Sequence, residues 1–110
     1  MSLISWDDFK QVDIRAGTIT KAEVFAEAQK PAFKLLIDLG PEIGLKKSSA
    51  QITNYECKEL AGLQVLCVVN LPPKQVANFM SEVLVTGFVL KNKTILSTSC
   101  ELIPNGSRLS

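Results

Sequence analysis

The 110-residue chain contains no histidine, so it lacks the side chain that most often serves as a general base or a metal ligand. It also lacks the glycine-rich patterns that cradle nucleotide phosphates in many enzymes. Paired carboxylates occur at Asp7 and Asp8, but a helix dipole and cap account for acidic residues in a first turn. Lysine and serine are adjacent at 46–49, yet neighbouring strand residues point to opposite faces. We therefore expect no enzyme, no cofactor and no metal.

Long apolar runs and cysteine pairs are also missing. The longest apolar run is Val65–Val69, far short of the roughly 20 residues that a membrane helix needs. Asp7 and Asp8 come early, so no basic segment followed by an apolar one opens the chain. The three cysteines, at positions 57, 67 and 100, form no CxxC pair. These features predict a cytoplasmic protein with free thiols and no membrane insertion.

Charge of either sign is nearly balanced. Twelve lysines and arginines stand against eleven aspartates and glutamates, which leaves a net charge of +1. A domain that binds a nucleic-acid duplex on its own usually has a clear excess of basic residues. Any nucleic-acid binding must therefore come from a local patch.

Apolar alternation and turn residues predict a chain made mostly of strands. Ser5 and Asp8 have capping-box spacing, which predicts a helix over residues 6–11. Gly17 permits a bulge or a sharp bend in a long first strand, and residues 54–62 favour a short helix. The result is an all-β, OB-type five-stranded Greek-key barrel with short edge helices. The expected strands are a long first strand that begins at Val12 and continues beyond Ile19 to a loop at 26–31, followed by 33–39, 45–52, 65–69, 83–88 and 94–97.

Residues 1–110 are expected to form one domain, with an N-terminal helical extension (1–11), a barrel (12–98) and a C-terminal extension (99–110). Residues 65–69 and 83–85 are apolar at consecutive positions, so both faces of these two strands need a cover. A second copy of the chain is the economical cover, which predicts a symmetric homodimer. Interface candidates are Trp6, Phe9, Val83 and Val85.

A polar loop at residues 70–82 separates the two apolar strands, and the polar strand 45–52 should expose one face. Loops at a barrel rim commonly carry binding residues, and OB barrels bind oligonucleotides on such strands and loops. Phe79 could stack on a splayed base. Taken alone, however, a phenylalanine at this position is more typical of a core or interface residue, and scattered lysines and serines on a sheet are more often a solvated face. RNA-binding candidates are Lys46, Lys47, Ser48, Ser49, Gln51, Asn70, Lys74, Ser81 and Glu82.

Three segments carry a family resemblance: DIRAGTITKAEVF (13–25), KKSSAQIT (46–53) and NLPPKQVANFMSEVLVTGF (70–88). They resemble the tRNA-binding-domain family, most closely its stand-alone CsaA branch. The resemblance implies an OB barrel, a homodimer built with terminal extensions, and tRNA recognised by shape. It places Ser48, Ser49, Gln51, Asn70, Lys74, Ser81 and Glu82 on the binding face. CsaA relatives are also described as export-related chaperones that bind unfolded or preprotein segments.

Two hypotheses on the ligand follow. Lys74 is the only cation of residues 70–82, which reduces the expected phosphate contacts and hence the affinity for tRNA. Val76, Phe79 and Met80 are candidates for an apolar groove that holds an extended polypeptide. The family signature favours tRNA, with the unfolded polypeptide as the alternative. A role as a subunit acting on a partner protein is neither supported nor excluded.

Overall fold

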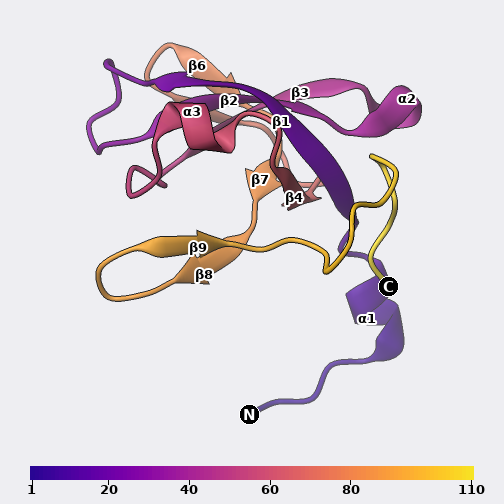
Figure 1. Ribbon diagram of the computed structural model, residues 1–110. Helices are drawn as coiled ribbons and strands as arrows, with labels where there is room; N and C mark the ends of the chain where they lie inside the picture. The colour runs from indigo at the N-terminus through magenta and orange to yellow at the C-terminus, as the bar shows by residue number, and fades with distance from the viewer.

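The computed structural model describes residues 1–110 and consists mainly of short antiparallel strands (Figure 1). Five strands form one sheet in the order β3-β2-β1-β4-β7. Two separate hairpins, β5–β6 and β8–β9, accompany it. The strands are β1 (Ile14–Val24), β2 (Phe33–Asp38), β3 (Leu45–Ala50), β4 (Gln64–Val68), β5 (Lys74–Val76), β6 (Phe79–Ser81), β7 (Leu84–Val85), β8 (Gly87–Val89) and β9 (Thr94–Leu96). The helices are α1 (Trp6–Lys10), α2 (Gly40–Ile43) and α3 (Cys57–Leu60).

The sheet curls until its two edges meet. The backbone N–H groups of Glu82 and Val83 donate to the carbonyl of Lys47 on β3, at 2.8 and 3.4 Å. The segment entering β7 is thereby tied to the opposite edge strand, and the five-stranded barrel is nearly closed. This confirms the predicted all-β OB-like barrel. Closure also leaves fewer unpaired backbone groups on edge strands, where other chains could add.

The barrel interior follows the sequence alternation of β2. Phe33, Leu35 and Ile37 are buried, while the residues between them are half-buried on the outer side. The predicted bulge at Gly17 is wrong, because the register of β1 shifts between Ile19 and Lys21 instead. Close packing explains the glycine: a Cβ at position 17 would lie 2.7 Å from side-chain carbons of Ile37 and Leu39.

Two local predictions for the helices agree with the structure. Ser5 caps α1: its hydroxyl accepts from the Asp8 backbone N–H, and the Asp8 carboxylate accepts from the Ser5 N–H. α3 brings Leu60 to a fully buried position in the core cluster. α3 is a single turn, so its packing against β1 rather than intrinsic propensity must stabilise it, whereas α1 has no buried residue and depends on its cap.

The C-terminal segment is bound to β1. Gly106 donates its N–H to the Ala16 carbonyl at 2.7 Å, and Arg15 donates to the Gly106 carbonyl at 3.0 Å. Arg15 also pairs with Asp13 at 2.6 Å, and this hydrogen bond lowers the pKa of the Asp13 carboxyl. A lowered pKa in the folded state means that the contribution of Asp13 to stability is present above its unfolded pKa and is lost as acid protonates it.

Burial makes Cys67 chemically different from Cys100. Cys67 is fully buried on β4, and burial raises the pKa of its thiol to about 12, whereas Cys100 is exposed. Because the thiolate is the reactive form and Cys67 is also buried, a thiol reagent at pH 8 should modify Cys100 much faster than Cys67. Mass spectrometry of peptides would measure both rates, with denatured protein as the control. Equal rates in the native protein would contradict the position of β4 in the core.

None of the helices is both long and apolar enough to span a membrane.

Candidate functional site

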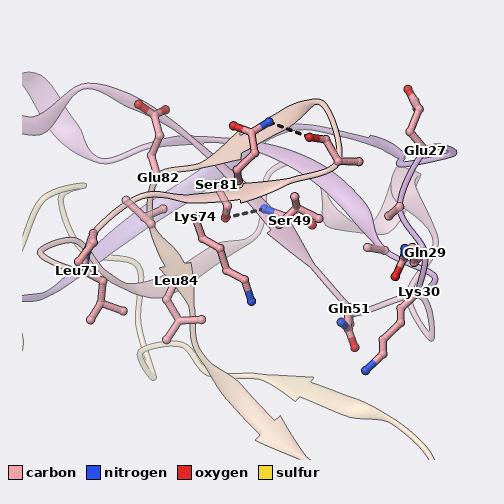
Figure 2. A pocket seen from close by; sticks show the side chains of 17 residues that line it. Glu27, Gln29, Lys30, Ser49, Gln51, Leu71, Lys74, Ser81, Glu82 and Leu84 are labelled. Carbon is pink, nitrogen blue, oxygen red and sulfur yellow. Dashed lines mark hydrogen bonds between the residues drawn. The ribbon is translucent and has the colours of Figure 1, made fainter.

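A cleft of about 670 Å³ opens between the β5–β6 hairpin and the loop that joins β1 to β2 (Figure 2). Lys74 extends into it from β5, while Gln29, Lys30 and Gln51 lie on the opposite side. Its floor includes Ser49 of β3. We call this space the cleft. Its remaining lining residues are Glu27, Ala28, Ala32, Leu71, Pro72, Gln75, Val76, Ala77, Ser81, Glu82, Val83 and Leu84.

The β5–β6 hairpin forms one wall because it is tied to β3. Ser49 donates its backbone N–H to the Ser81 hydroxyl at 3.0 Å, and Lys47 donates its N–H to the Glu82 carboxylate at 3.0 Å. At the turn, Ala77 has a positive φ of 49°, a conformation that non-glycine residues rarely adopt. The sequence predicts a plain loop at 70–82; that prediction is wrong, since the segment contains a paired hairpin.

The structure brings many of the predicted RNA-binding residues together in the cleft. Ser49 and Gln51 come from the floor, and Lys74, Ser81 and Glu82 from the hairpin and the residue that follows it. Hydroxyl, amide and ammonium groups therefore line one continuous space. Lys47 lies outside the cleft, on the outer face of β3, where its register partner is Leu36 of β2.

Besides Lys47, three predicted RNA-binding residues lie outside the cleft. Ser48 is buried inside the barrel opposite Leu35, so its hydroxyl cannot reach a ligand. Lys46 pairs with Ile37 and so lies on the interior side of β3, near the barrel end. The Asn70 amide accepts from the Asp13 N–H and donates to the Gln11 carbonyl, which occupies it structurally. The period of two along β3 separates residues 46 and 48 from 47 and 49.

The apolar candidates of the hairpin also separate. Val76 lines the cleft, and Met80 is exposed on β6 outside it. Phe79 packs edge-on against the buried ring of Phe25, with ring centroids 5.4 Å apart. Phe79 therefore anchors the hairpin to Phe25, just after the end of β1. This packing role agrees with the explanation of Phe79 as a core or interface residue in the sequence analysis.

Sequence reasoning missed the wall formed by the β1–β2 loop. Glu27, Gln29 and Lys30 are exposed there and face the hairpin across the cleft. The sequence gives only a weak signal for them, namely a polar loop that joins the first two strands of an OB-type barrel. Their addition balances the charge of the cleft, because its lining then includes two lysines, Lys30 and Lys74, and two glutamates, Glu27 and Glu82. No cluster of potential metal ligands occurs in the chain.

A second cavity, of about 470 Å³, lies where the two chain ends meet. Trp6 and Phe9 of α1, with Val12 and Leu109, form its apolar lining. Trp6 is 84% exposed. The interface candidate Val83 is instead buried in the barrel core at 5% exposure, and Val85 is half-buried against that core. The prediction of Val83 as an interface residue is wrong because barrel closure, through the Lys47 carbonyl, turns it inward.

Residues 14–108 match the family described as "Putative tRNA binding domain". A crystal structure of the chaperone CsaA from Bacillus anthracis superimposes with a TM-score of 0.93 and is 47% identical, covering 99% of this chain and 100% of that one. The chain is a CsaA-type member of the tRNA-binding domain family. Another CsaA chaperone structure, from Picrophilus torridus, has the same TM-score and identity and covers 98% of this CsaA-type chain.

Longer proteins contain the same domain. A methionine–tRNA ligase from Salinibacter ruber is 39% identical over 84 residues, which are 72% of this chain. The CsaA-type chain spans only 11% of the length of that enzyme. Its similarity to the ligase is therefore confined to one domain.

Proposed function

We propose that this chain is a non-catalytic, homodimeric tRNA-binding protein that docks tRNA in the cleft by shape and by phosphate contacts. The observation that carries the proposal is the cleft itself, where Ser49, Gln51, Lys74 and Ser81 converge with the β1–β2 loop. Membership of the tRNA-binding domain family supports the choice of tRNA. The cytoplasm, where tRNA is used, is the proposed site of action.

The chemistry of the cleft suits RNA. Hydroxyl and amide groups such as those of Ser49, Gln51 and Gln29 both donate and accept hydrogen bonds, as the 2′-hydroxyl of ribose requires. The ammonium groups of Lys74 and Lys30 can contact phosphates. Glu27 and Glu82 limit the net charge, so that one cleft should hold tRNA weakly. Two clefts in a dimer would raise the overall affinity through effective concentration.

Exposed apolar side chains support the dimer. Phe88 is 64% exposed and Val89 is 85% exposed on the β8–β9 hairpin, which projects from the barrel (Figure 1). A two-stranded hairpin is marginally stable in water unless something packs against it. Trp6 and the apolar lining of the second cavity add uncovered surface at residues 1–11 and 99–110. We propose these two extensions and the hairpin as the dimer interface.

A charge reversal at Lys74 tests the proposal. Lys74→Glu removes one phosphate contact and adds repulsion. The loss of one contact alone should lower log K for tRNA by about 0.7 at 0.1 M salt. With the added repulsion, the affinity for bulk tRNA should therefore fall more than about fivefold. A gel shift would measure the affinity of both proteins for tRNA. Binding by the natural sequence should weaken steeply between about 0.05 and 0.2 M salt, a range that includes the cellular ionic strength.

Lys58→Glu on α3 is the matched control, because it makes the same charge reversal on an exposed lysine outside both the cleft and the proposed dimer interface. It should leave tRNA binding unchanged. Equal losses for the two variants would mean that net charge alone, not the cleft, governs binding.

The second candidate function is a chaperone that holds extended polypeptide. Exposed Met80 and cleft-lining Val76 favour it, and so does the similarity to the two CsaA chaperone structures. Apolar contacts resist salt, so suppression of aggregation should persist at high salt and should weaken in Met80→Ser. That substitution is a sharper probe than a change at Phe79, because Phe79 also holds the hairpin to Phe25.

A further inference from the structure

The cleft holds two cations and two carboxylates, so any uncompensated positive charge near it must come from neighbouring residues. Lys34 and Lys47 supply it on the outer face of the barrel. Lys34 is the register partner of Ser49, which lines the cleft, and Lys47 is the partner of Leu36. Cross-strand partners share a face of a sheet. Both ammonium groups therefore rise from the face to which the floor of the cleft belongs.

The two ammonium groups gather around one aromatic ring. The Lys34 Nζ lies 5.8 Å from the ring centroid of Phe79, and the Lys47 Nζ lies 5.3 Å from the same centroid. The Lys34 Nζ also lies 5.3 Å from the ring of Phe25. Ring faces attract cations at such distances. The Phe25–Phe79 pair thus holds both lysines at defined positions beside the hairpin.

Neither lysine has a carboxylate partner. The ion pairs of the chain within 4.0 Å involve Arg15, Lys21, Lys58 and Arg108 only. Two acidic residues are close in the fold but engaged otherwise. Glu23, opposite Lys34 on β1, is paired with Lys21, and the Glu82 carboxylate accepts from the Lys47 backbone N–H. Two ammonium groups at one ring, with no carboxylate within 4.0 Å of either, are available to contact a phosphate.

We propose that Lys34 and Lys47 form a phosphate-binding pair beside the cleft, positioned by Phe79, across which the backbone of the bound RNA passes. This inference rests on the proposed function and adds its main phosphate contacts. It also reassigns Phe79: cations stand over its ring, so it acts as a positioning residue rather than as a platform for a base.

Salt-dependent tRNA binding tests the pair. Each phosphate contact contributes about 0.7 to the magnitude of the slope of log K against log salt. The double variant Lys34→Gln/Lys47→Gln loses two contacts, so this magnitude should fall by about 1.4. The affinity at 0.1 M salt should fall roughly 25-fold. Lys34→Arg/Lys47→Arg keeps both charges and should keep the slope. Lys58→Gln on α3 removes a positive charge outside both the cleft and the proposed dimer interface, and should leave the slope unchanged.

The role of Phe79 has a different signature. Phe79→Leu keeps apolar bulk and leaves the charge count unchanged, so the slope should be preserved while affinity falls about twofold to fivefold, the scale of an exposed cation–π contact. Phe79→Tyr should restore the affinity. A merely structural role would instead lower the melting temperature of Phe79→Leu without a loss of tRNA affinity at temperatures where the variant is folded.

The outcomes separate the two proposals. If the natural sequence does not bind tRNA, the proposed function fails. If it binds, and the Lys34→Gln/Lys47→Gln variant keeps both slope and affinity, the phosphate-binding pair is overturned while the cleft stands.

Discussion

Gly40→Ala is expected to destabilise the protein by about 3 kcal/mol or more. Gly40 has a φ of +89°, and a Cβ there would clash with the backbone carbonyl oxygen of Asn105. Left-handed backbone costs a non-glycine residue ~1–2 kcal/mol, and overpacking adds ~1–3 kcal/mol. Because domains of this size are stable by only about 5–15 kcal/mol, the melting temperature should fall by roughly 12 °C or more.

Gly44→Ala provides the matched control. Gly44 has a similar φ of +83°, but no atom lies within 4 Å of the position that its Cβ would take. Its ψ of −160° places Gly44 in a region that is essentially restricted to glycine, so only backbone strain of ~1–3 kcal/mol should appear. The difference between the two variants in chemical denaturation isolates the contact with Asn105. Equal losses would mean that the C-terminal segment does not pack against α2.

The second large effect is expected at the dimer interface. Phe88→Asp places a charge on the exposed apolar tip region of the β8–β9 hairpin. Aromatic residues at interface centres contribute ~2–4 kcal/mol, which corresponds to at least a 30-fold rise in the dissociation constant of the dimer. Light scattering at micromolar concentration should show a dimer for the natural sequence and a monomer for the variant.

Val24→Asp serves as the control for this experiment, because Val24 is equally exposed, at 67%, but lies at the end of β1 in the barrel. It should leave the dimer intact. A natural sequence that is monomeric under the same conditions would refute the dimer altogether. A dimer that survives Phe88→Asp but dissociates in Trp6→Asp would move the interface to α1.

Dimerisation should itself strengthen tRNA binding, because it brings two clefts together. If two weak clefts act together, Phe88→Asp should weaken tRNA binding although no cleft residue has changed. The salt slope should also fall, since fewer phosphates are contacted at once.

Local patterns predicted the barrel well because each acts over a few residues. Alternation from Phe33 to Ile37 predicts β2, and the spacing of Ser5 and Asp8 predicts the cap of α1. The β5–β6 hairpin has no such signal. Its turn places Ala77 at positive φ, where glycine or asparagine is the usual residue. Contacts with β3, far away in the sequence, must therefore stabilise it.

Long-range polar contacts were also invisible in the sequence. Gln64 is 8% exposed, and its side chain donates to the carbonyl of Ile103 and accepts from the Ile103 N–H. A glutamine in an apolar strand gives no hint of a partner 39 residues away. The same limit hid the Lys34 and Lys47 pair, because only the fold of the hairpin brings Phe79 between them. Val83 is the opposite case, because its apolar run gives a clear signal in the sequence. That signal does not indicate which residue of the run barrel closure buries.

Amide chemical-shift mapping with bulk tRNA at 0.1 M salt, close to the cellular ionic strength, tests the central claim most directly. We expect the largest changes at Gln29, Lys30, Ser49, Gln51 and Lys74, on the two walls and the floor of the cleft. Changes confined to α1 and the β8–β9 hairpin, with the cleft amides unmoved, would contradict it.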